Sequence, residues 1–320
     1  MKNYFSKKSL TNAFKILKNT FTGFMADKGL KLSASLSYYT LFSLAPLLLL
    51  IISLAGVIFG QTASEGRIFD EINGLIGAEA ATQVQQIIRN LQLSGKSTLS
   101  AIIGAITLVI GATTVFGEIQ DSINMIWRVK AKPKRGWLKM LKDRLLSGSI
   151  IVGLGFLLIV SLIINGALMA LNEILRSYFP DLTIILINIA NIVISFAVIT
   201  VLFGVIFKVL PDAKIAWKDV RAGAFFTALL FMLGRYLIGI YIETTAAGSP
   251  YGAAGSIIVI LLWIYYTAAI LYFGAEYTRE YACFKGARIQ PAEYAVYVEQ
   301  KETERNVDFI PSKHEGEDKK

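Results

Sequence analysis

The sequence contains one cysteine, Cys283, and one histidine, His314, among 320 residues. A single cysteine excludes an intramolecular disulfide. Because Cys283 and His314 are both isolated, the sequence also offers no set of ligands for a zinc ion. The motifs HExxH, GxSxG and the phosphate-binding P-loop do not occur in it. We therefore expect no enzymatic activity, no metal site and no cofactor.

Charged residues are also scarce. They make up 17% of the chain, and 54% of its residues are hydrophobic, whereas about 25% of the residues of soluble domains are charged. This composition predicts an all-α integral membrane protein. Hydropathy windows of about 19 residues predict six transmembrane helices, which cover residues 33–59, 99–116, 146–171, 182–209, 220–242 and 256–273.

The basic residues are distributed unevenly between the two sides of these six spans. Of the 32 Lys and Arg residues, 27 flank the spans on the side of the two termini, and 4 lie on the other side. By the positive-inside rule, both termini are therefore expected in the cytoplasm. The basic residues are scattered over four membrane-flanking segments, which argues against nucleic acid as a partner and favours membrane lipids.

The segments outside the six spans have patterns of their own. Residues 1–32 predict a cytoplasmic amphipathic helix with apolar residues at helical spacing, and this helix either lies on the inner leaflet or packs on the ends of the spans. The loop 61–98 predicts a small helical element outside the membrane. Residues 276–320 are expected to form a cytoplasmic tail that is disordered from about residue 290.

Polar side chains gather in the cytoplasmic half of the predicted membrane domain. The first span carries several hydroxyl groups before Pro46, a residue that we expect to kink the helix. Carboxylates at the inner ends of spans are either hydrated and paired with loop Lys and Arg, or take part in gating. The residues predicted to form an inner polar path are Ser33, Ser37, Tyr38, Tyr39, Thr40, Glu118, Tyr265, Tyr266 and Glu276.

A second polar group is predicted near the outer surface. Arg235 lies in the outer third of the fifth span, and Asn165, Asn188 and Asn191 are expected at a similar depth. These four residues can converge as an outer polar vestibule. Two structural alternatives remain open, namely that Arg235 extends to the lipid headgroups and that the three amides hold helices together.

Four stretches of the sequence resemble the YihY/BrkB family of bacterial membrane proteins, formerly labelled the ribonuclease BN family. They are LSYYTLFSLAPLLLL (36–50), FGEIQDSINMIW (116–127), LPDAKIAWKDVRAGA (210–224) and YGAAGSIIVILLWIYYTAAILYFGAEYT (251–278). With the spacing of the spans, the resemblance covers roughly residues 10 to 285. It implies a six-helix inner-membrane protein for which solute export is a plausible role. The residues do not support ribonuclease activity.

Together these features predict a transporter or exporter of a small polar solute, such as an osmolyte. Hydroxyl and amide groups can replace the hydrogen bonds that water makes to such a solute, without the deep trap of a fixed charge. The alternative is an envelope scaffold or lipid-handling protein that uses its basic inner face and its amphipathic N-terminal helix. No feature of the sequence indicates an oligomeric state.

Overall fold

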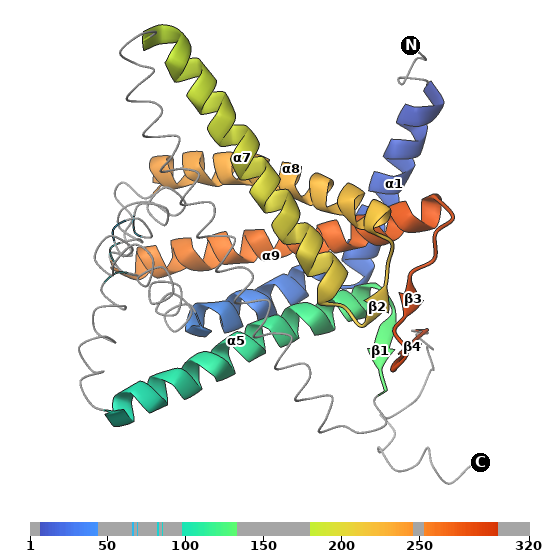
Figure 1. Ribbon diagram of the computed structural model, residues 1–320, viewed down its shortest axis with the longest axis horizontal. Helices are drawn as coiled ribbons and strands as arrows, with labels where there is room; N and C mark the ends of the chain where they lie inside the picture. Colours follow the sequence, from blue (N-terminus) through green and yellow to red (C-terminus); the bar gives the residue numbers. More distant parts are fainter. Residues whose placement is uncertain are drawn as a thin grey trace, which may run out of the picture.

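The structure is a computed structural model that describes residues 7–43, 98–132, 180–245 and 253–299, together with four isolated positions between 66 and 85. Within these ranges the chain is mostly helical (Figure 1). A helix without a label in the figure covers residues 29–43. The labelled helices are α1 (Lys7–Ala26), α5 (Thr98–Ile126), α7 (Pro180–Val209), α8 (Trp217–Thr245) and α9 (Ala253–Phe284).

In the described part of the chain, three helices contain segments that are long and apolar enough to cross a membrane. These segments are Ile189–Val209 in α7, Trp217–Ile238 in α8 and Ile257–Phe284 in α9, which correspond to the fourth, fifth and sixth predicted spans. The third predicted span, the kink at Pro46 and nearly all of the loop 61–98 lie outside the described residues. The full set of six spans and their orientation stay predictions.

Several helices extend beyond the boundaries predicted from hydropathy. The helix α5 continues to Ile126, although its apolar stretch ends near residue 116, and α9 continues to Phe284 rather than ending near 273. Residues 276–284 therefore belong to α9 and not to a tail. The N-terminal helix ends at Ala26, and the next helix begins at residue 29 rather than 33. Hydropathy predicts the apolar stretch, whereas a helix can continue wherever its polar residues find partners.

The segment after α9 is ordered by strand pairing. Strand β1 (Val129–Ala131) pairs antiparallel with β4 (Ala295–Tyr297), and β2 (Ala213–Lys214) pairs antiparallel with β3 (Gln290–Pro291). The prediction of disorder from about residue 290 is therefore wrong for residues 290–297. These strands have only two or three residues, too few to produce an alternating pattern in the sequence. We call this end of the molecule, on the right of Figure 1, the strand end.

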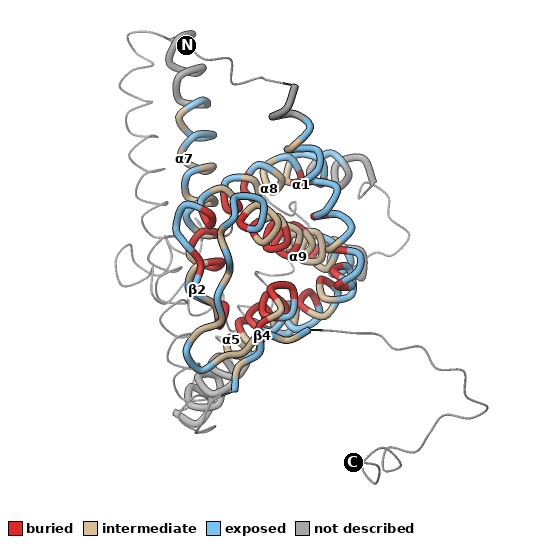
Figure 2. The backbone as a smooth tube through the Cα atoms, turned by 90° about the vertical axis from the view of Figure 1, so that its right-hand side faces the viewer, coloured by how far each residue is buried: buried red, intermediate tan, exposed pale blue. Residues whose placement is uncertain are grey.

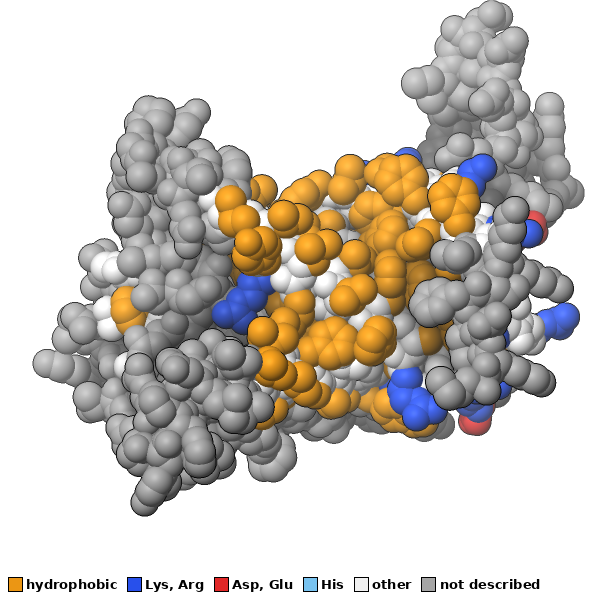
Figure 3. All heavy atoms as spheres, turned by 90° about the horizontal axis from the view of Figure 1, so that it is seen from above, with side chains coloured by type: hydrophobic (Ala, Val, Ile, Leu, Met, Phe, Trp, Pro, Cys, Tyr) orange, Lys and Arg blue, Asp and Glu red, His pale blue; other side chains and the backbone are white. Residues whose placement is uncertain are grey.

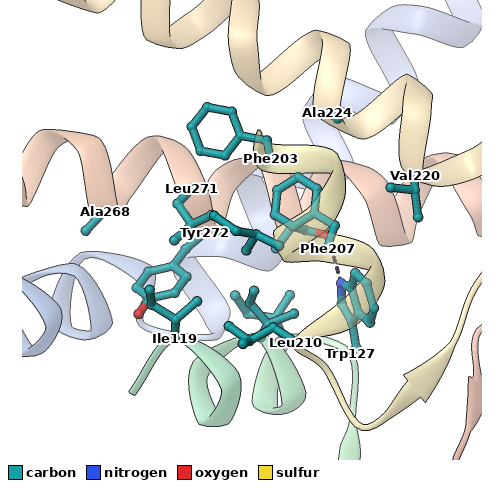
Figure 4. Packing of buried hydrophobic residues seen from close by; sticks show 14 of the residues in the cluster. Ile119, Trp127, Phe203, Phe207, Leu210, Val220, Ala224, Ala268, Leu271 and Tyr272 are labelled. Atoms are coloured by element: carbon teal, nitrogen blue, oxygen red, sulfur yellow. Dashed lines mark hydrogen bonds between the residues drawn. The ribbon is translucent and has the colours of Figure 1, made fainter. Parts of the chain in front are cut away.

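The buried core lies towards the strand end, around α9. Viewed from that end, α9 runs between α1, α5 and α8, with buried residues facing the centre (Figure 2). Tyr272 and Phe207 are fully buried, and Leu210 is 1% exposed; they pack with residues of α5 (Figure 4). Since burying a large apolar side chain contributes about 1.5–3 kcal/mol, this cluster fixes how the four long helices meet.

Helices α8 and α9 pack closely through two reciprocal glycine–threonine contacts. The segment GAFFT (223–227) of α8 lies antiparallel to GAEYT (274–278) of α9. A Cβ atom added to Gly223 would overlap Thr278 Oγ1, at 1.8 Å, and one added to Gly274 would lie 1.9 Å from Thr227 Oγ1. Each threonine hydroxyl donates to the carbonyl four residues earlier in its own helix, at 2.7 Å, so both polar groups are satisfied inside the interface.

Large apolar side chains remain exposed on the outer faces of the long helices. Examples are Ile192 on α7, and Phe225 and Leu233 on α8, with exposures of 55–58%. Hydrophobic side chains cover the middle of the face seen from above, and several Lys and Arg side chains lie towards the strand end (Figure 3). An apolar surface of this kind is suited to contact with lipid.

Candidate functional site

A cluster of charged side chains is buried at the strand end, where α1, α5 and α9 meet. Its members, which we call the ion network, are Asp27, Arg128, Glu276, Arg279 and Glu280. The Asp27 and Glu276 side chains are 2% and 0% exposed. Because a buried charge is unfavourable unless it is paired, the contacts of these two carboxylates decide what the cluster can do.

Asp27 joins the turn after α1 to two guanidinium groups. Arg128 Nη2 donates a hydrogen bond to Asp27 Oδ1 at 2.5 Å, and Arg279 Nη1 lies 3.6 Å from Asp27 Oδ2. Lys28 and Arg128 both have left-handed backbone conformations, with φ of 56° and 59°. For residues other than glycine, this conformation costs about 1–3 kcal/mol. The Asp27–Arg128 ion pair thus links two strained turns.

Glu276 lies deeper in the same cluster, on α9. Arg279 Nη2, from the next turn of that helix, is 2.6 Å from Glu276 Oε1. Neither oxygen of the Glu276 carboxylate accepts a well-oriented hydrogen bond from the described residues. The carboxylate lies against the backbone of α1, since a Cβ atom added to Gly23 would be 1.9 Å from Glu276 Oε1. Glu276 is therefore a buried carboxylate with a charge partner but without directed hydrogen bonds.

Two bonds to backbone carbonyls hold the end of α5 against α9 beside the ion network. Trp127 Nε1 donates to the carbonyl oxygen of Ala275 at 3.0 Å (dashed line in Figure 4). In the opposite direction, Arg279 Nη1 donates to the carbonyl oxygen of Ile126 at 2.5 Å. Arg279 Nη2 also contacts Glu280 Oε1 at 3.2 Å. Arg279 is thus shared between three carboxylates and one carbonyl.

A second buried polar cluster fixes the connection that follows α7. Asn124 Nδ2 donates to Asp212 Oδ2 at 2.9 Å, and Gln120 Nε2 donates to Asp212 Oδ1 at 3.2 Å. In return, the backbone N–H of Asp212 donates to Asn124 Oδ1 at 2.8 Å. Asn124 and Gln120 are one turn apart on α5, which explains why both reach the same carboxylate. This cluster positions β2 and the start of α8.

The chain matches the family model described as "Virulence factor BrkB" over residues 20–295. It belongs to the BrkB family. The match includes every member of the ion network and the whole of α5, α7, α8 and α9. The resemblance found in the sequence is therefore confirmed.

Curated relatives in the BrkB family are named as membrane proteins. A UPF0761 membrane protein of Psychrobacter sp. (strain PRwf-1) is 27% identical over 87% of this chain and 50% of its own length. One from Stenotrophomonas maltophilia (strain K279a) is 25% identical over 84% of this chain and 61% of its own. The chain thus spans one half to about three fifths of these relatives. No solved structure matches it. With its apolar helices, this BrkB-family chain is a membrane protein.

Two of the hydroxyl groups predicted for the inner polar path, those of Ser33 and Ser37, bond within their own helix. Ser33 Oγ donates to the Gly29 carbonyl at 2.7 Å and Ser37 Oγ to the Ala34 carbonyl at 2.9 Å, and both side chains are buried. Tyr38 and Tyr39 are 59% and 38% exposed. The remaining members Thr40, Glu118, Tyr265 and Tyr266 are half-buried. The structure therefore brings only part of this group into the interior.

The predicted outer residues are described only in part. Asn165 lies outside the described residues, and for Asn188 only the helical backbone of α7 is described. Asn191 is exposed on α7, and Arg235 is half-buried on α8. A Cβ atom added to Gly234 would lie 1.9 Å from Tyr266 Oη. Tyr266, assigned to the inner group from the sequence, is thus level with the residue next to Arg235.

The sequence indicates Glu276 but not the other members of the ion network. Asp27 falls within the predicted N-terminal helix, and Arg128 is one of many basic residues in a predicted loop. The spacing of Glu276 and Arg279, three residues apart in a helix, could have indicated the ion pair between them. The contacts of Asp27 with Arg128 and with Arg279 join positions about 100 and about 250 residues apart. A single sequence holds no pattern for contacts between such distant positions.

Proposed function

We propose that this protein is an inner-membrane transporter that exports a small polar solute. The observation that carries the proposal is the fully buried carboxylate of Glu276 in α9, a helix long and apolar enough to span a membrane. An ionisable residue in such a segment costs at least about 2.5–3.5 kcal/mol at its centre, and such residues typically mark ion or substrate pathways. In this account the strand end faces the cytoplasm, as the distribution of basic residues predicts.

Polar groups along the interface of α8 and α9 support a route for the solute. The ion network lies at the strand end, and Tyr266 is ten residues from Glu276 along α9, about 15 Å at the rise of an α-helix. The Tyr266 hydroxyl packs beside Gly234, next to Arg235. We propose that Asn165, Asn188, Asn191 and Arg235 form the outer part of the route, and that Tyr266 connects it to the ion network.

The chemistry of these groups favours uncharged or zwitterionic solutes. Hydroxyl and amide groups offer both donors and acceptors, which suit polyols, sugars and zwitterions. Arg235 provides five N–H donors in a planar arrangement that suits a carboxylate or a phosphate. A compatible osmolyte that carries a carboxylate combines both requirements.

The second candidate function, lipid handling or scaffolding, is favoured by the surface of α1. Ile16, Thr20 and Phe24 are buried on one face of this helix. Phe14 and Phe21, on another face, are 70% and 55% exposed, with exposed lysines beside them. This face is suited to anionic lipid at a membrane surface. It is compatible with a helix that lies on the inner leaflet and with one that packs on the ends of the spans.

Untargeted metabolite profiling after a hypo-osmotic shift tests the export of a solute. Wild type and Arg235→Ala are compared at matched protein level with a strain that lacks the protein. We expect one polar solute to be released by the wild type and to be missing from the medium of the other two strains. Leu237→Ala, which truncates an exposed side chain of the same helix, is the control and should release the solute normally.

Indistinguishable profiles in all strains would argue against export and favour the lipid-handling function. If Arg235→Ala lowers the amount of folded protein in the membrane, release must be compared per folded molecule. Arg235→Lys then provides a milder variant, because it keeps the positive charge and loses the planar arrangement of donors.

A further inference from the structure

The carboxylate of Glu276 is surrounded by four other charged groups, which a transport route alone does not require. Among the described residues, the charged groups that face it are Arg279 and Glu280 of α9, Asp27 of the turn after α1 and Arg128 after α5. With every member of the ion network ionised, three carboxylates stand against two guanidinium groups, which leaves one negative charge. An uncompensated charge in a desolvated cluster is unfavourable, and one bound proton would neutralise it.

The contacts indicate which of the three carboxylates is best suited to take up that proton. Asp27 accepts a hydrogen bond from Arg128 at 2.5 Å and lies near Arg279. Glu280 contacts Arg279 and accepts a hydrogen bond from Asn19 Nδ2 at 3.4 Å, and its side chain is 20% exposed. Among the described residues, Glu276 is fully buried, and it has one shared ion pair there and no directed hydrogen bond. Its charged form is therefore the least stabilised of the three.

We propose that Glu276 is a proton-binding site, and that proton binding there controls how firmly α1 is held on α9. In this step a proton from the cytoplasmic water adds to a carboxylate oxygen of Glu276 and forms the neutral acid. No other bond is made or broken. Arg279 stays charged and is released from Glu276 to the neighbouring carboxylates, Asp27 at 3.6 Å and Glu280 at 3.2 Å.

This exchange of partners connects the proton to the helices. Asp27 lies in the turn between α1 and helix 29–43, so a stronger contact with Arg279 fixes that turn on α9. The carboxylate of Glu276 also touches the backbone of α1 at Gly23, so its charge state changes the contact between α1 and α9 directly. Coupling of this proton to solute export rests on the proposed function, whereas proton binding itself does not.

Infrared difference spectroscopy on the full-length protein tests the proton site. The wild type and the variants Glu276→Gln and Glu280→Gln are reconstituted in vesicles of phosphatidylethanolamine and phosphatidylglycerol, and spectra are recorded as the pH is raised. We expect a carboxylic-acid carbonyl band that the wild type loses on alkalinisation. Glu280→Gln removes one of the three negative charges, so it should lose the same band at a lower pH. This band should be missing from Glu276→Gln at every pH. An unchanged band in Glu276→Gln, or no such band in the wild type, would overturn the proposal.

A second variant separates protonation from folding. Glu276→Asp keeps a carboxyl group, so it should show the band at a shifted frequency. If Glu276→Gln does not fold, this shift identifies the residue that carries the proton. A band at an unshifted frequency in Glu276→Asp would assign it to another carboxyl group and refute the site.

Solute release measured on the same samples separates coupling from export. If export is coupled to the proton, a pH gradient should alter solute release by the wild type, and Glu276→Gln should abolish this dependence. Equal dependence in both would overturn the coupling and leave the proton site in place. Absence of release from the wild type would instead contradict the proposed function. The infrared spectra would still show whether Glu276 binds a proton.

Discussion

The carboxylate of Glu276 lies directly against the backbone of Gly23, so that α1 closes the ion network from one side. Glycine is required here for space and not for conformational freedom, since Gly23 lies within a regular helix. A Cβ atom would be 1.9 Å from Oε1 and 2.8 Å from Cδ of Glu276. The contact joins the N-terminal helix to the most deeply buried charge in the described part of the chain.

Gly23→Ala is therefore expected to destabilise the protein, although alanine is the better helix former. Insertion of a methyl group into a packed site costs about 1–3 kcal/mol, and here it displaces a carboxylate from its ion pair. Gly117→Ala is the matched control, because no atom of the described part of the chain lies within 4 Å of a Cβ atom at that position of α5. Thermal unfolding in detergent should show a lower midpoint for Gly23→Ala only. Equal midpoints would contradict the close contact with Glu276.

The reciprocal contacts between α8 and α9 lead to a second prediction. Gly274→Ala should destabilise the protein, because its Cβ atom would overlap the Thr227 side chain. Adding Thr227→Gly removes the overlapping atoms. The double variant should therefore lose less stability than the sum of the losses in the two single variants. Unfolding midpoints of the two single variants and the double variant measure this coupling. Strict additivity would show that the two residues do not meet.

The cluster around Asp212 predicts an order of effects within α5. Asn124→Ala removes two hydrogen bonds to Asp212, whereas Gln120→Ala removes one longer bond. A buried group that loses its partner costs about 1–3 kcal/mol, so Asn124→Ala should be the more destabilising change. Chemical denaturation of both variants in the same detergent provides the comparison. The reverse order would contradict the assigned bonds.

Asp27 is predicted to be coupled to Arg128. Removing one partner leaves the other charge poorly solvated and without its ion pair. Removing both partners leaves no unpaired charge from this ion pair. The double variant Asp27→Ala, Arg128→Ala should therefore be more stable than the sum of the single effects implies, with a coupling of about 0.5–3 kcal/mol. A double-mutant cycle measured by thermal unfolding tests this. A coupling near zero would mean that the ion pair does not hold the turn after α1.

The sequence predicted the apolar helices and the membrane setting far better than it predicted the contacts at the strand end. Apolar runs such as those of α7 and α9 are local signals, and the family could be identified from motifs. The strands β1 and β4 have three residues each and pair positions 164 to 168 residues apart. Asp27 meets Arg279 over a still longer separation. Neither the strand pairing nor the Asp27–Arg279 contact leaves a periodic pattern in the sequence, because both depend on how the helices pack.

The hydroxyl groups of helix 29–43 show a different reason why the polar path could be predicted only in part. Their number in an apolar segment suggested a polar lining, but serine in a helix can bond to the carbonyl one turn earlier. Ser33 and Ser37 make such bonds. Ser43 also donates to the Gly111 carbonyl of α5 at 3.1 Å, so it joins two helices. Composition alone does not separate these roles from a polar lining.

Release of solutes from a defined vesicle is the most direct test of whether this protein is an exporter. Proteoliposomes that contain the purified wild type, Arg235→Ala or no protein are loaded with a mixture of polyols, sugars and zwitterions, and the retained solutes are measured by mass spectrometry over time. We expect the wild type to lose one class of solute selectively, and the other two samples to retain it. Equal retention of every solute in all three samples would contradict a transport function.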